Sequence, residues 1–442
     1  MRSMAGLCVG WWAVLSVGAG AEPPKAEQPG ATQATATRSA KASAEWPAWR
    51  GPTGDGLSPE VPRTMPIVKF LWRKEMAGIC HAGPSAARGV VIAGDYDTKN
   101  DLYRCYEART GKELWTYSVP NARKMDYGPA PRASPLICKD KVICLGAFGD
   151  LHCVSLKTGR RVWQKDFSRD FGSGKPPTWG HCSSPLLADG KVIVRPGGKR
   201  GTLVALSPDS GQVLWAGPGA GPNYAGLIAA TFAGVRQIVA YDSKNLVGWD
   251  LSSGKVLWSL EIDTTRGYTV PAPLAVKGKL VTSTEDECTR LFAFDKEGRI
   301  IPQPEALNED LAPEIATPVA CGRLLLGSTD GLICLDLDDK LKTLWIEEDA
   351  EELLGMLHIV AWRDRALIFN DEGTMLLVAP ERKGCRILGK AKLCKSTWSH
   401  PALANGKVFI RDKKHLYCYE LRMKAAAGAA SHTARRSDEA RR

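Results

Sequence analysis

Short runs of alternating apolar and polar residues recur along this chain, separated by turns rich in Asp, Asn, Gly and Lys. Two examples are the stretches 191–194 (KVIV) and 203–206 (LVAL). Alternation with a period of two between such turns predicts short antiparallel β-strands. No segment keeps a 3.6-residue apolar period across a full repeating unit, which excludes helical and horseshoe repeats. The pattern therefore predicts an all-β fold.

One longer phrase repeats: an apolar strand after a proline, a polar turn, a second strand, and then a leucine followed by a Gly-Lys turn and Leu-Trp. Tryptophans mark the ends of its copies at Trp72, Trp115, Trp163, Trp215, Trp258 and Trp345. They are separated by 43, 48, 52, 43 and 87 residues, the last gap being two units in which one tryptophan was lost. Four strands in about 45 residues is the signature of one β-propeller blade.

Degenerate copies bring the count to eight. One unit has lost its tryptophan near Pro302, the next ends at Leu388, and the last stops at Leu421, one strand short. Residues 70–74 (FLWRK) carry the signature of an outer strand with no blade in front of it. We therefore predict an eight-bladed β-propeller of four-stranded blades, in which this N-terminal strand lies beside residues 416–421 and closes the last blade.

The two ends of the chain differ from its body. Residues 1–21 hold one early cation, an apolar run and an Ala-Gly-Ala cleavage site, which predicts a secretory signal peptide. A transmembrane anchor is the weaker interpretation because the run is glycine-rich and no stop-transfer charges follow it. We expect a disordered linker at 22–45, the propeller at 46–423 and a disordered basic tail at 424–442. The protein is then exported, periplasmic or secreted, without a transmembrane segment.

Composition and charge add little to the prediction of fold and function. The formal net charge is +11, but the cations are spread through turns, and no nucleic-acid motif is present. We therefore interpret the charge as solubilising and expect no nucleic-acid partner. Four cysteines share the repeat slot that Ala205, Gly248 and Ala293 fill elsewhere, so we expect them to be small buried strand residues: Cys105, Cys153, Cys334 and Cys418. No disulfide is assigned.

The repeated tryptophans invite two interpretations. An indole ring can stack on a sugar or a cofactor, or it can pack between neighbouring blades. One tryptophan per blade at a fixed place beside a Gly-Lys turn favours the structural role.

The blade endings, for example residues 251–258 (LSSGKVLW), resemble the pyrroloquinoline-quinone (PQQ)-like propeller repeat. Quinoprotein dehydrogenases share that repeat with BamB, the propeller of the outer-membrane barrel-assembly machinery. The opening residues 46–52 (WPAWRGP) are similar to the start of exported PQQ-like proteins of planctomycete-type bacteria. The resemblance covers about residues 46–421 and implies the fold, but a fold does not fix an activity.

Few of the enzymatic features of quinoprotein dehydrogenases have counterparts in this sequence. Quinoprotein alcohol dehydrogenases stack the quinone on a disulfide of adjacent cysteines and hold calcium with Glu, Asn and Asp in the channel. This chain has no Cys-Cys pair, no Cys-x-x-Cys-His haem motif and few carboxylates in the corresponding loops. We therefore expect no cofactor, and PQQ with calcium only if the chain is an oxidoreductase after all.

Residues just before each innermost strand should ring one mouth of the propeller channel. These are the candidate ligand-binding residues: His81, Arg132, Trp179, His181, Tyr224, Tyr268, His358, Trp398 and His400. Their rings and nitrogens could bind an anion, a carbohydrate or a peptide. The alternatives are that they only fill the channel, or that the histidines hold a metal ion. No catalytic residue and no metal ligand is assigned.

Because the recognisable motifs are all structural, we expect a non-catalytic binding or scaffolding protein of the cell envelope, BamB-like in its type of role. Its partner would be a protein or a carbohydrate, and we expect a monomer. The alternative is a PQQ-dependent quinoprotein oxidoreductase acting on alcohols or sugars.

Overall fold

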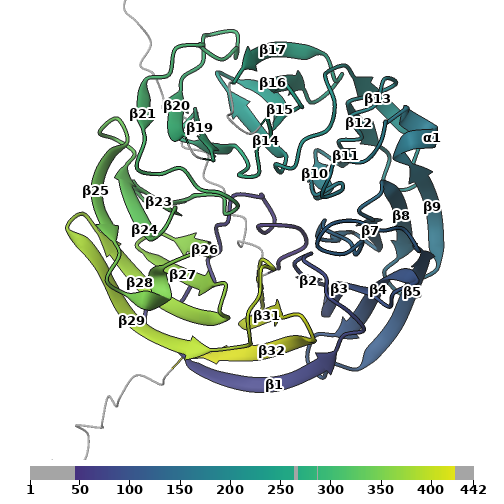
Figure 1. The fold of residues 1–442 in the computed structure, drawn as a ribbon, viewed down its shortest axis with the longest axis horizontal. Coiled ribbons are helices and arrows are strands. Elements are labelled where there is room, and N and C mark those ends of the chain that lie inside the picture. Colours follow the sequence, from purple (N-terminus) through teal and green to yellow (C-terminus); the bar gives the residue numbers. More distant parts are fainter. Residues whose placement is uncertain (1–44, 263–266, 286, 424–442) are drawn as a thin grey trace, which may run out of the picture. The chain divides into compact units, whose positions relative to one another are not determined.

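Eight four-stranded sheets surround a central channel in the computed structural model, which describes residues 45–262, 267–285 and 287–423 (Figure 1). The pairing of strands is antiparallel throughout, and seven sheets are built from four consecutive strands. The predicted eight-bladed propeller is confirmed. The predicted signal peptide and basic tail, and all but the last residue of the predicted linker, lie outside the described residues.

The blades are numbered in chain order, and the strands of each blade are given from the channel outwards. Blade 1 consists of β2 (Ser85–Ala87), β3 (Val90–Tyr96), β4 (Asn100–Glu107) and β5 (Glu113–Pro120). Blade 2 consists of β6 (Leu136–Cys138), β7 (Lys141–Leu145), β8 (Asp150–Ser155) and β9 (Arg161–Asp166). Blade 3 consists of β10 (Leu186–Ala188), β11 (Lys191–Val194), β12 (Leu203–Leu206) and β13 (Val213–Gly217). Blade 4 consists of β14 (Ile228–Phe232), β15 (Val235–Tyr241), β16 (Asn245–Asp250) and β17 (Val256–Glu261).

The second half of the ring repeats this plan. Blade 5 consists of β18 (Leu274–Val276), β19 (Lys279–Thr284), β20 (Cys288–Phe292) and β21 (Ala306–Asn308). Blade 6 consists of β22 (Val319–Cys321), β23 (Leu324–Ser328), β24 (Leu332–Asp336) and β25 (Lys342–Glu347). Blade 7 consists of β26 (Leu357–Trp362), β27 (Arg365–Asn370), β28 (Thr374–Glu381) and β29 (Gly384–Lys392). Blade 8 consists of β30 (Ala402–Ala404), β31 (Lys407–Arg411), β32 (His415–Arg422) and β1 (Ile67–Glu75).

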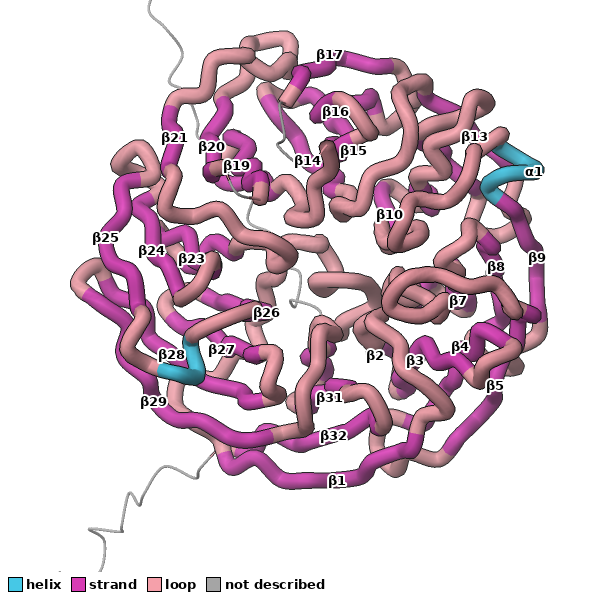
Figure 2. Tube along the Cα trace, in the orientation of Figure 1, coloured by secondary structure: helices cyan, strands magenta, loops and turns pink. Residues whose placement is uncertain are grey.

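Two short helices interrupt the strands (Figure 2): α1 (Phe167–Phe171) and the 3-10 turn η1 (Glu351–Leu353). In the part of the chain that the structure describes, neither is long or apolar enough to cross a membrane.

Burial follows the position of each strand in its blade. The second and third strands are covered on both faces by the neighbouring blades, so that all four residues of β12 and all five of β24 are buried. The outermost strands alternate instead, as in β5 and β13, because one face lies on the next blade and the other meets solvent. This is why the sequence mixes short continuous apolar runs with alternating ones.

The ring is closed by strands from opposite ends of the chain. β1 pairs with β32 from Ile67 opposite Arg422 to Glu75 opposite His415, and Trp72 lies opposite Cys418. The predicted closure beside residues 416–421 is therefore confirmed. It gives blade 8 its fourth strand and joins both ends of the described chain in one sheet.

The repeated tryptophans join each blade to the next. The indole N–H of Trp115 in blade 1 donates to the Leu156 carbonyl of blade 2 at 2.8 Å, and that of Trp163 in blade 2 donates to the Pro208 carbonyl of blade 3 at 2.9 Å. Trp72, Trp215 and Trp345 make the same bond to the blade that follows theirs. These rings therefore lie at the interfaces between neighbouring blades.

Two small residues make room for the indoles of four tryptophans, Trp72, Trp115, Trp163 and Trp215. The glycine of the Gly-Lys turn in the next blade has a positive φ, and a Cβ added to Gly159 or Gly211 would lie 2.7 Å from the indole of Trp115 or Trp163. On the other side, the third strand places a small residue opposite the tryptophan, such as Cys105 opposite Trp115. The cysteines of the repeat are therefore buried packing residues, as predicted.

Two blades solve this packing differently. In blade 4 the indole of Trp258 donates to Gln237, which in turn donates to the Gly298 carbonyl of blade 5. In blade 7 Gly389 stands at the tryptophan position, one residue beyond the predicted Leu388, and Met65 from the N-terminal segment packs against it. The interface between blades is thus kept where the sequence signature is lost.

We predict that Trp163→Ala and Trp215→Ala each lower the free energy of unfolding by about 3–5 kcal/mol, because each removes a buried indole and its hydrogen bond. Leu214→Ala is the matched control on the same strand, since that side chain is 47% exposed, and should change stability by less than about 0.5 kcal/mol. Chemical denaturation of the three variants measures the difference. Equal stabilities would show that the indoles do not hold the blades together.

Candidate functional site

Residues 46–58, here called the floor segment, cross one end of the channel before the chain reaches β1 at the rim (Figure 1). The segment bonds to the inner strands of blades 1, 2 and 7. These bonds run between Trp46 and Ala86 in both directions, from the Ile137 N–H to the Pro47 carbonyl, from the Ala361 N–H to the Gly56 carbonyl and from the Ser58 N–H to the Ala361 carbonyl. Strand edges that would otherwise face an empty channel are satisfied by the chain itself.

Arg50 anchors the middle of the floor segment. Its side chain is buried, and its guanidinium donates to four carbonyls, those of Gly54, Asp55, Thr317 and Pro318. Burial lowers the pKa of Arg50 to about 10, with the Asp55 charge acting in the opposite direction. The neighbouring Trp49 packs so closely on blade 4 that a Cβ on Gly226 would come within 2.3 Å of its ring. The opening motif WPAWRGP is therefore the floor of the channel.

Above this floor lies a cavity of about 550 Å³, within the range of small-ligand sites. Its walls follow a simple rule of register. The residue four positions before the inner strand lines the cavity in seven blades: His81, Arg132, Cys182, Tyr224, Val270, Ile315 and Trp398. The residue two positions before it does so in seven blades as well: Gly83, Ser134, Ser184, Gly226, Thr317, Gly355 and His400. Each blade thus offers alternate residues of an extended segment to the channel.

The structure brings eight of the nine candidate residues together around this cavity: His81, Arg132, Trp179, Tyr224, Tyr268, His358, Trp398 and His400. His181 is the exception. It stands five positions before β10, on the other side of the extended segment, and packs edge-on against Phe167 of α1 at 4.9 Å. Cys182 takes the wall position instead. His81, His181 and His400 lie four, five and two residues before their inner strands, so the three histidines do not occupy equivalent positions in their blades.

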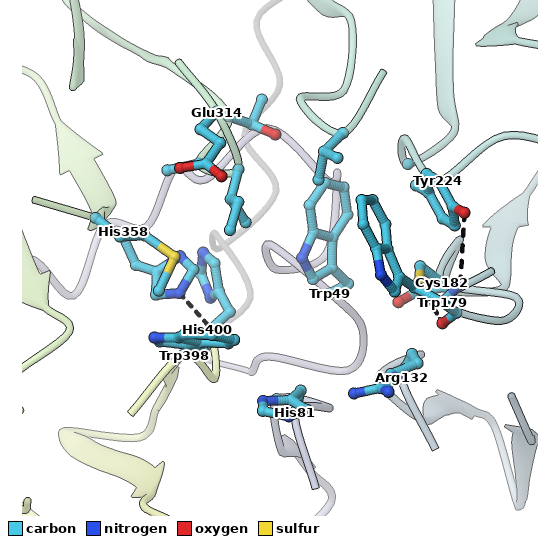
Figure 3. A pocket seen from close by; sticks show the side chains of 18 of the residues that line it. Trp49, His81, Arg132, Trp179, Cys182, Tyr224, Glu314, His358, Trp398 and His400 are labelled. Atoms are coloured by element: carbon cyan, nitrogen blue, oxygen red, sulfur yellow. Dashed lines mark hydrogen bonds between the residues drawn. The ribbon is translucent and has the colours of Figure 1, made fainter. Parts of the chain in front are cut away.

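Two aromatic clusters flank the cavity. In the first, Trp398 stacks on His81 at 5.3 Å and meets Tyr127 at 5.9 Å. In the second, Trp179 lies 5.0 Å from Tyr224 and 5.1 Å from Tyr268, measured between ring centroids. Figure 3 shows Trp398 and Trp179 on opposite sides, with Trp49 of the floor between them. Trp398 is 45% and Tyr127 63% exposed, so ring surface in the first cluster is open to a ligand.

The cavity histidines are neutral at physiological pH. Burial lowers the pKa of His81 to about 4, and the charges of Arg132 and Arg411 act in the same direction. Burial also lowers the pKa of His358 to about 4 and that of His400 well below the ordinary range. Nε2 of His400 has no hydrogen-bond partner among the described residues. Neutral imidazoles with such low pKa values are weak bases near pH 7.

Charged groups occupy different arcs of the wall. Arg132 of blade 2 donates through Nη2 to the carbonyls of Asp126 and Gly128, both at 2.7 Å. Glu285, Glu314 and Asp371 come from blades 5 to 7. Figure 3 places Glu314 across the cavity from Arg132. Among the described residues, Glu314 and Asp371 form no ion pair, and both carboxylates face a cavity whose opposite wall carries a cation.

Two further buried arginines hold the wall segments in place. Arg411 of blade 8 donates to the carbonyls of Gly78 and Gly94 beside blade 1, and Arg195 of blade 3 donates to carbonyls that include Ala225 before blade 4. Burial lowers the pKa of Arg195 to about 9. Because these cations bond to backbone carbonyls, they fix the loops from which the cavity side chains project.

The residues present do not fit a calcium-bound quinone. Calcium requires six to eight oxygen ligands, roughly, around one point. In the described part of the chain no three His, Cys, Asp or Glu side chains gather into a metal-binding group. The twelve described cysteines are unpaired and none adjoins another in sequence, so a vicinal disulfide cannot form beneath a quinone ring. Burial raises the pKa of the cavity thiol Cys182 to about 11, which leaves it protonated.

Several cavity residues escaped the sequence analysis: Trp49, Arg50, Tyr127, Cys182, Glu285, Glu314 and Asp371. The motif WPAWRGP was recognised, but its position in the channel was not. Few carboxylates were expected because only the loops before the inner strands were considered. Of these, Glu314 alone lies there, whereas Glu285 and Asp371 follow the second strands of their blades. Counting four and two positions back from each inner strand would have identified Cys182 as a cavity residue and excluded His181.

Comparison with known proteins gives a consistent family. A family model described as outer membrane protein assembly factor BamB matches residues 99–347, more than half of the chain. The outer membrane protein assembly factor BamB of Yersinia pestis is 23% identical over 268 residues, covering 60% of this chain and 63% of that protein. The protein of the same name from Burkholderia pseudomallei is 24% identical over 190 residues. The chain thus aligns with less than two thirds of the length of these curated relatives.

Solved structures share the fold. BamB from Moraxella catarrhalis superposes with a TM-score of 0.57 at 14% identity, covering 80% of this chain and all of that one. A quinohemoprotein alcohol dehydrogenase from Comamonas testosteroni gives a TM-score of 0.60 at 12% identity, covering 87% and 81%. At such identities the likeness extends to the propeller and not to the activity.

The low pKa of His81 predicts an effect of acid on stability. As the pH falls through about 6.5, the unfolded chain takes up a proton at this imidazole that the folded protein does not accept until pH about 4, so the free energy of unfolding decreases across that window. His81→Gln should make the decrease shallower between pH 6.5 and 4, as measured by denaturation at a series of pH values. A slope unchanged from that of the parent protein would contradict the burial of a neutral His81.

Proposed function

Because this chain belongs to the family of PQQ-like propellers described by the outer membrane protein assembly factor BamB, we propose that it is a non-catalytic binding protein of the cell envelope. Its ligand occupies the cavity above the floor segment. The name of the relatives supports a role in holding other envelope components, and the expected signal peptide supports export to that compartment. The partner is a protein or a carbohydrate.

The observation that carries this proposal is the cavity itself. Trp49 and Arg50 seal one end of the channel, and aromatic residues flank the space above them. The channel keeps about 550 Å³ open among rings that are held in fixed contacts. Such a preorganised concave site, lined by rings and a few polar groups, is the usual form of a small-ligand site.

The chemistry of the wall favours binding over catalysis. The histidines His81 and His358 have pKa values of about 4, and the thiol of Cys182 has a pKa of about 11, so neither type of group is poised for acid–base or nucleophilic work near pH 7. The oxidoreductase alternative would also need an oxygen-rich calcium site, and the described residues do not supply one.

We predict that the mature protein captures a ligand through the mouth of the cavity. A photo-crosslinking residue, p-benzoylphenylalanine, in place of the 63% exposed Tyr127 should give a discrete adduct when the protein is made in its own cell and the envelope fraction is irradiated. The control carries the same residue in place of Phe70, which is 51% exposed on β1 at the outer rim, and should not give this adduct.

A second measurement tests the alternative. The purified protein mixed with pyrroloquinoline quinone and calcium should not reduce a redox dye in the presence of alcohols or sugars. Dye reduction that depends on the quinone would establish an oxidoreductase and overturn the proposal, as would accumulation of the protein in the cytosol without any adduct at residue 127.

A further inference from the structure

The cavity has one mouth, ring surfaces on two sides and polar groups between them. We propose that it binds the end of a neutral glycan chain, with sugar rings lying against the two aromatic clusters. This inference rests on the proposed function, because it names the class of ligand for the same site. It follows from ring exposure, from the polar groups and from the strand edges that the chain has already covered.

The ring surfaces suit the faces of sugars. A pyranose has one face made mainly of C–H groups, which packs against the face of an indole or a phenol. Trp398 offers such a surface beside Tyr127, and Trp179 forms part of the second cluster across the cavity. Rings in fixed contact with one another lose little conformational freedom when a ligand arrives, so the stacking surface is available at low entropic cost.

The polar groups suit hydroxyls. Carboxylates accept hydrogen bonds from neighbouring hydroxyls, and a guanidinium donates to hydroxyl oxygens. Asp371 and Glu314 project from one arc of the wall and Arg132 from another, so a ring held between the aromatic clusters can be bonded from both sides. Nη1 of Arg132 remains for this, because Nη2 is committed to backbone carbonyls and Nε is buried.

The cavity offers fewer binding groups to a peptide than to a glycan. An extended peptide gains most of its affinity by adding a strand to an open sheet edge. The edges of β2, β6 and β26 that face the channel already bond to the floor segment, and Arg50 caps the carbonyls of Thr317 and Pro318 before β22. At these four blades the cavity offers ring surface and side-chain polarity, which a hydroxyl-rich ligand uses better than a polypeptide backbone does.

The shape of the cavity selects a chain end. The floor segment crosses the far end of the channel, where Trp49 and Arg50 line the cavity, so we expect only the terminal residues of a polymer to enter. The charge on the wall selects against acidic sugars, because Glu314 of blade 6 and Asp371 of blade 7 face the space from one arc and Arg132 faces it from the opposite one. The other cation of the cavity, Arg50, has its guanidinium bonded to backbone carbonyls. We therefore expect neutral or amino sugars to bind better than uronic acids.

Calorimetric titration of the full mature protein tests the class of ligand. The probes are cellotetraose and chitotetraose as neutral oligosaccharides and tetragalacturonate as the acidic one. At least one neutral probe should bind with one site per chain, and tetragalacturonate should bind more weakly.

Matched variants locate the site. Trp398→Ala should weaken binding about tenfold or more, and Trp398→Tyr should restore part of the loss because it keeps a ring face. Asp371→Asn should also weaken it. Phe70→Ala and Glu372→Gln are the controls, the first an exposed ring at the rim and the second a carboxylate next in sequence that faces Lys392, and both should bind as the parent does. Because Trp398 is 45% exposed, its variants should keep the parent's melting temperature.

The outcomes separate this inference from the proposed function. Mass spectrometry of the adduct at residue 127 should find hexose or hexosamine units. An adduct made only of peptide, together with no heat from any neutral oligosaccharide, overturns the glycan while leaving a binding protein. If no adduct forms and no oligosaccharide binds, both the glycan inference and the proposed binding function are overturned. Equal losses in Trp398→Ala and Phe70→Ala would place any glycan outside the cavity and overturn the inference.

Discussion

The pairing of β1 with β32 is the constraint on which the rest of the molecule depends. A propeller blade cannot stand alone, because its middle strands are apolar on both faces and need a blade on each side. The ring therefore has to close, and here it closes by bringing the N-terminal strand to the rim of blade 8. The residues before that strand must then travel from the channel to the rim, and on the way they cover the inner edges of three blades. Closure and the sealed floor are thus two consequences of one path of the chain.

Within the ring, the same contact is repeated with local substitutions. An indole, a glycine at positive φ in the next blade and a small residue on the third strand fit together at the interfaces of Trp72, Trp115, Trp163 and Trp215. Where the tryptophan is missing, as in blade 7, Met65 packs against Gly389 in its place. Since these contacts lie at the outer part of the blades, the loops at the channel are left free to vary, and their side chains differ from blade to blade.

The sequence predicted the architecture well because the repeat is a local pattern: strand, turn, strand and tryptophan each leave a mark within about 45 residues. It located eight residues of the cavity wall for the same reason, as inner strands begin at recognisable prolines and small residues. It failed at His181, where one residue of register turned the side chain from the channel to Phe167. It also failed at Arg50 and Trp49, whose role depends on contacts with Pro318 and Gly226, far away in the sequence. No local pattern reports such contacts.

The central claim is that the floor segment belongs to the folded ring and makes the channel a cavity with a single mouth. Hydrogen exchange of individual amides measures this directly. The account predicts that the amides of Trp46, Ser58, Ile137 and Ala361, which bond between the floor segment and the inner strands, exchange as slowly as amides within the blades. Rapid exchange at Trp46 and Ser58, with slow exchange kept in the blades, would show a detached segment and a channel open at both ends, and would contradict the account.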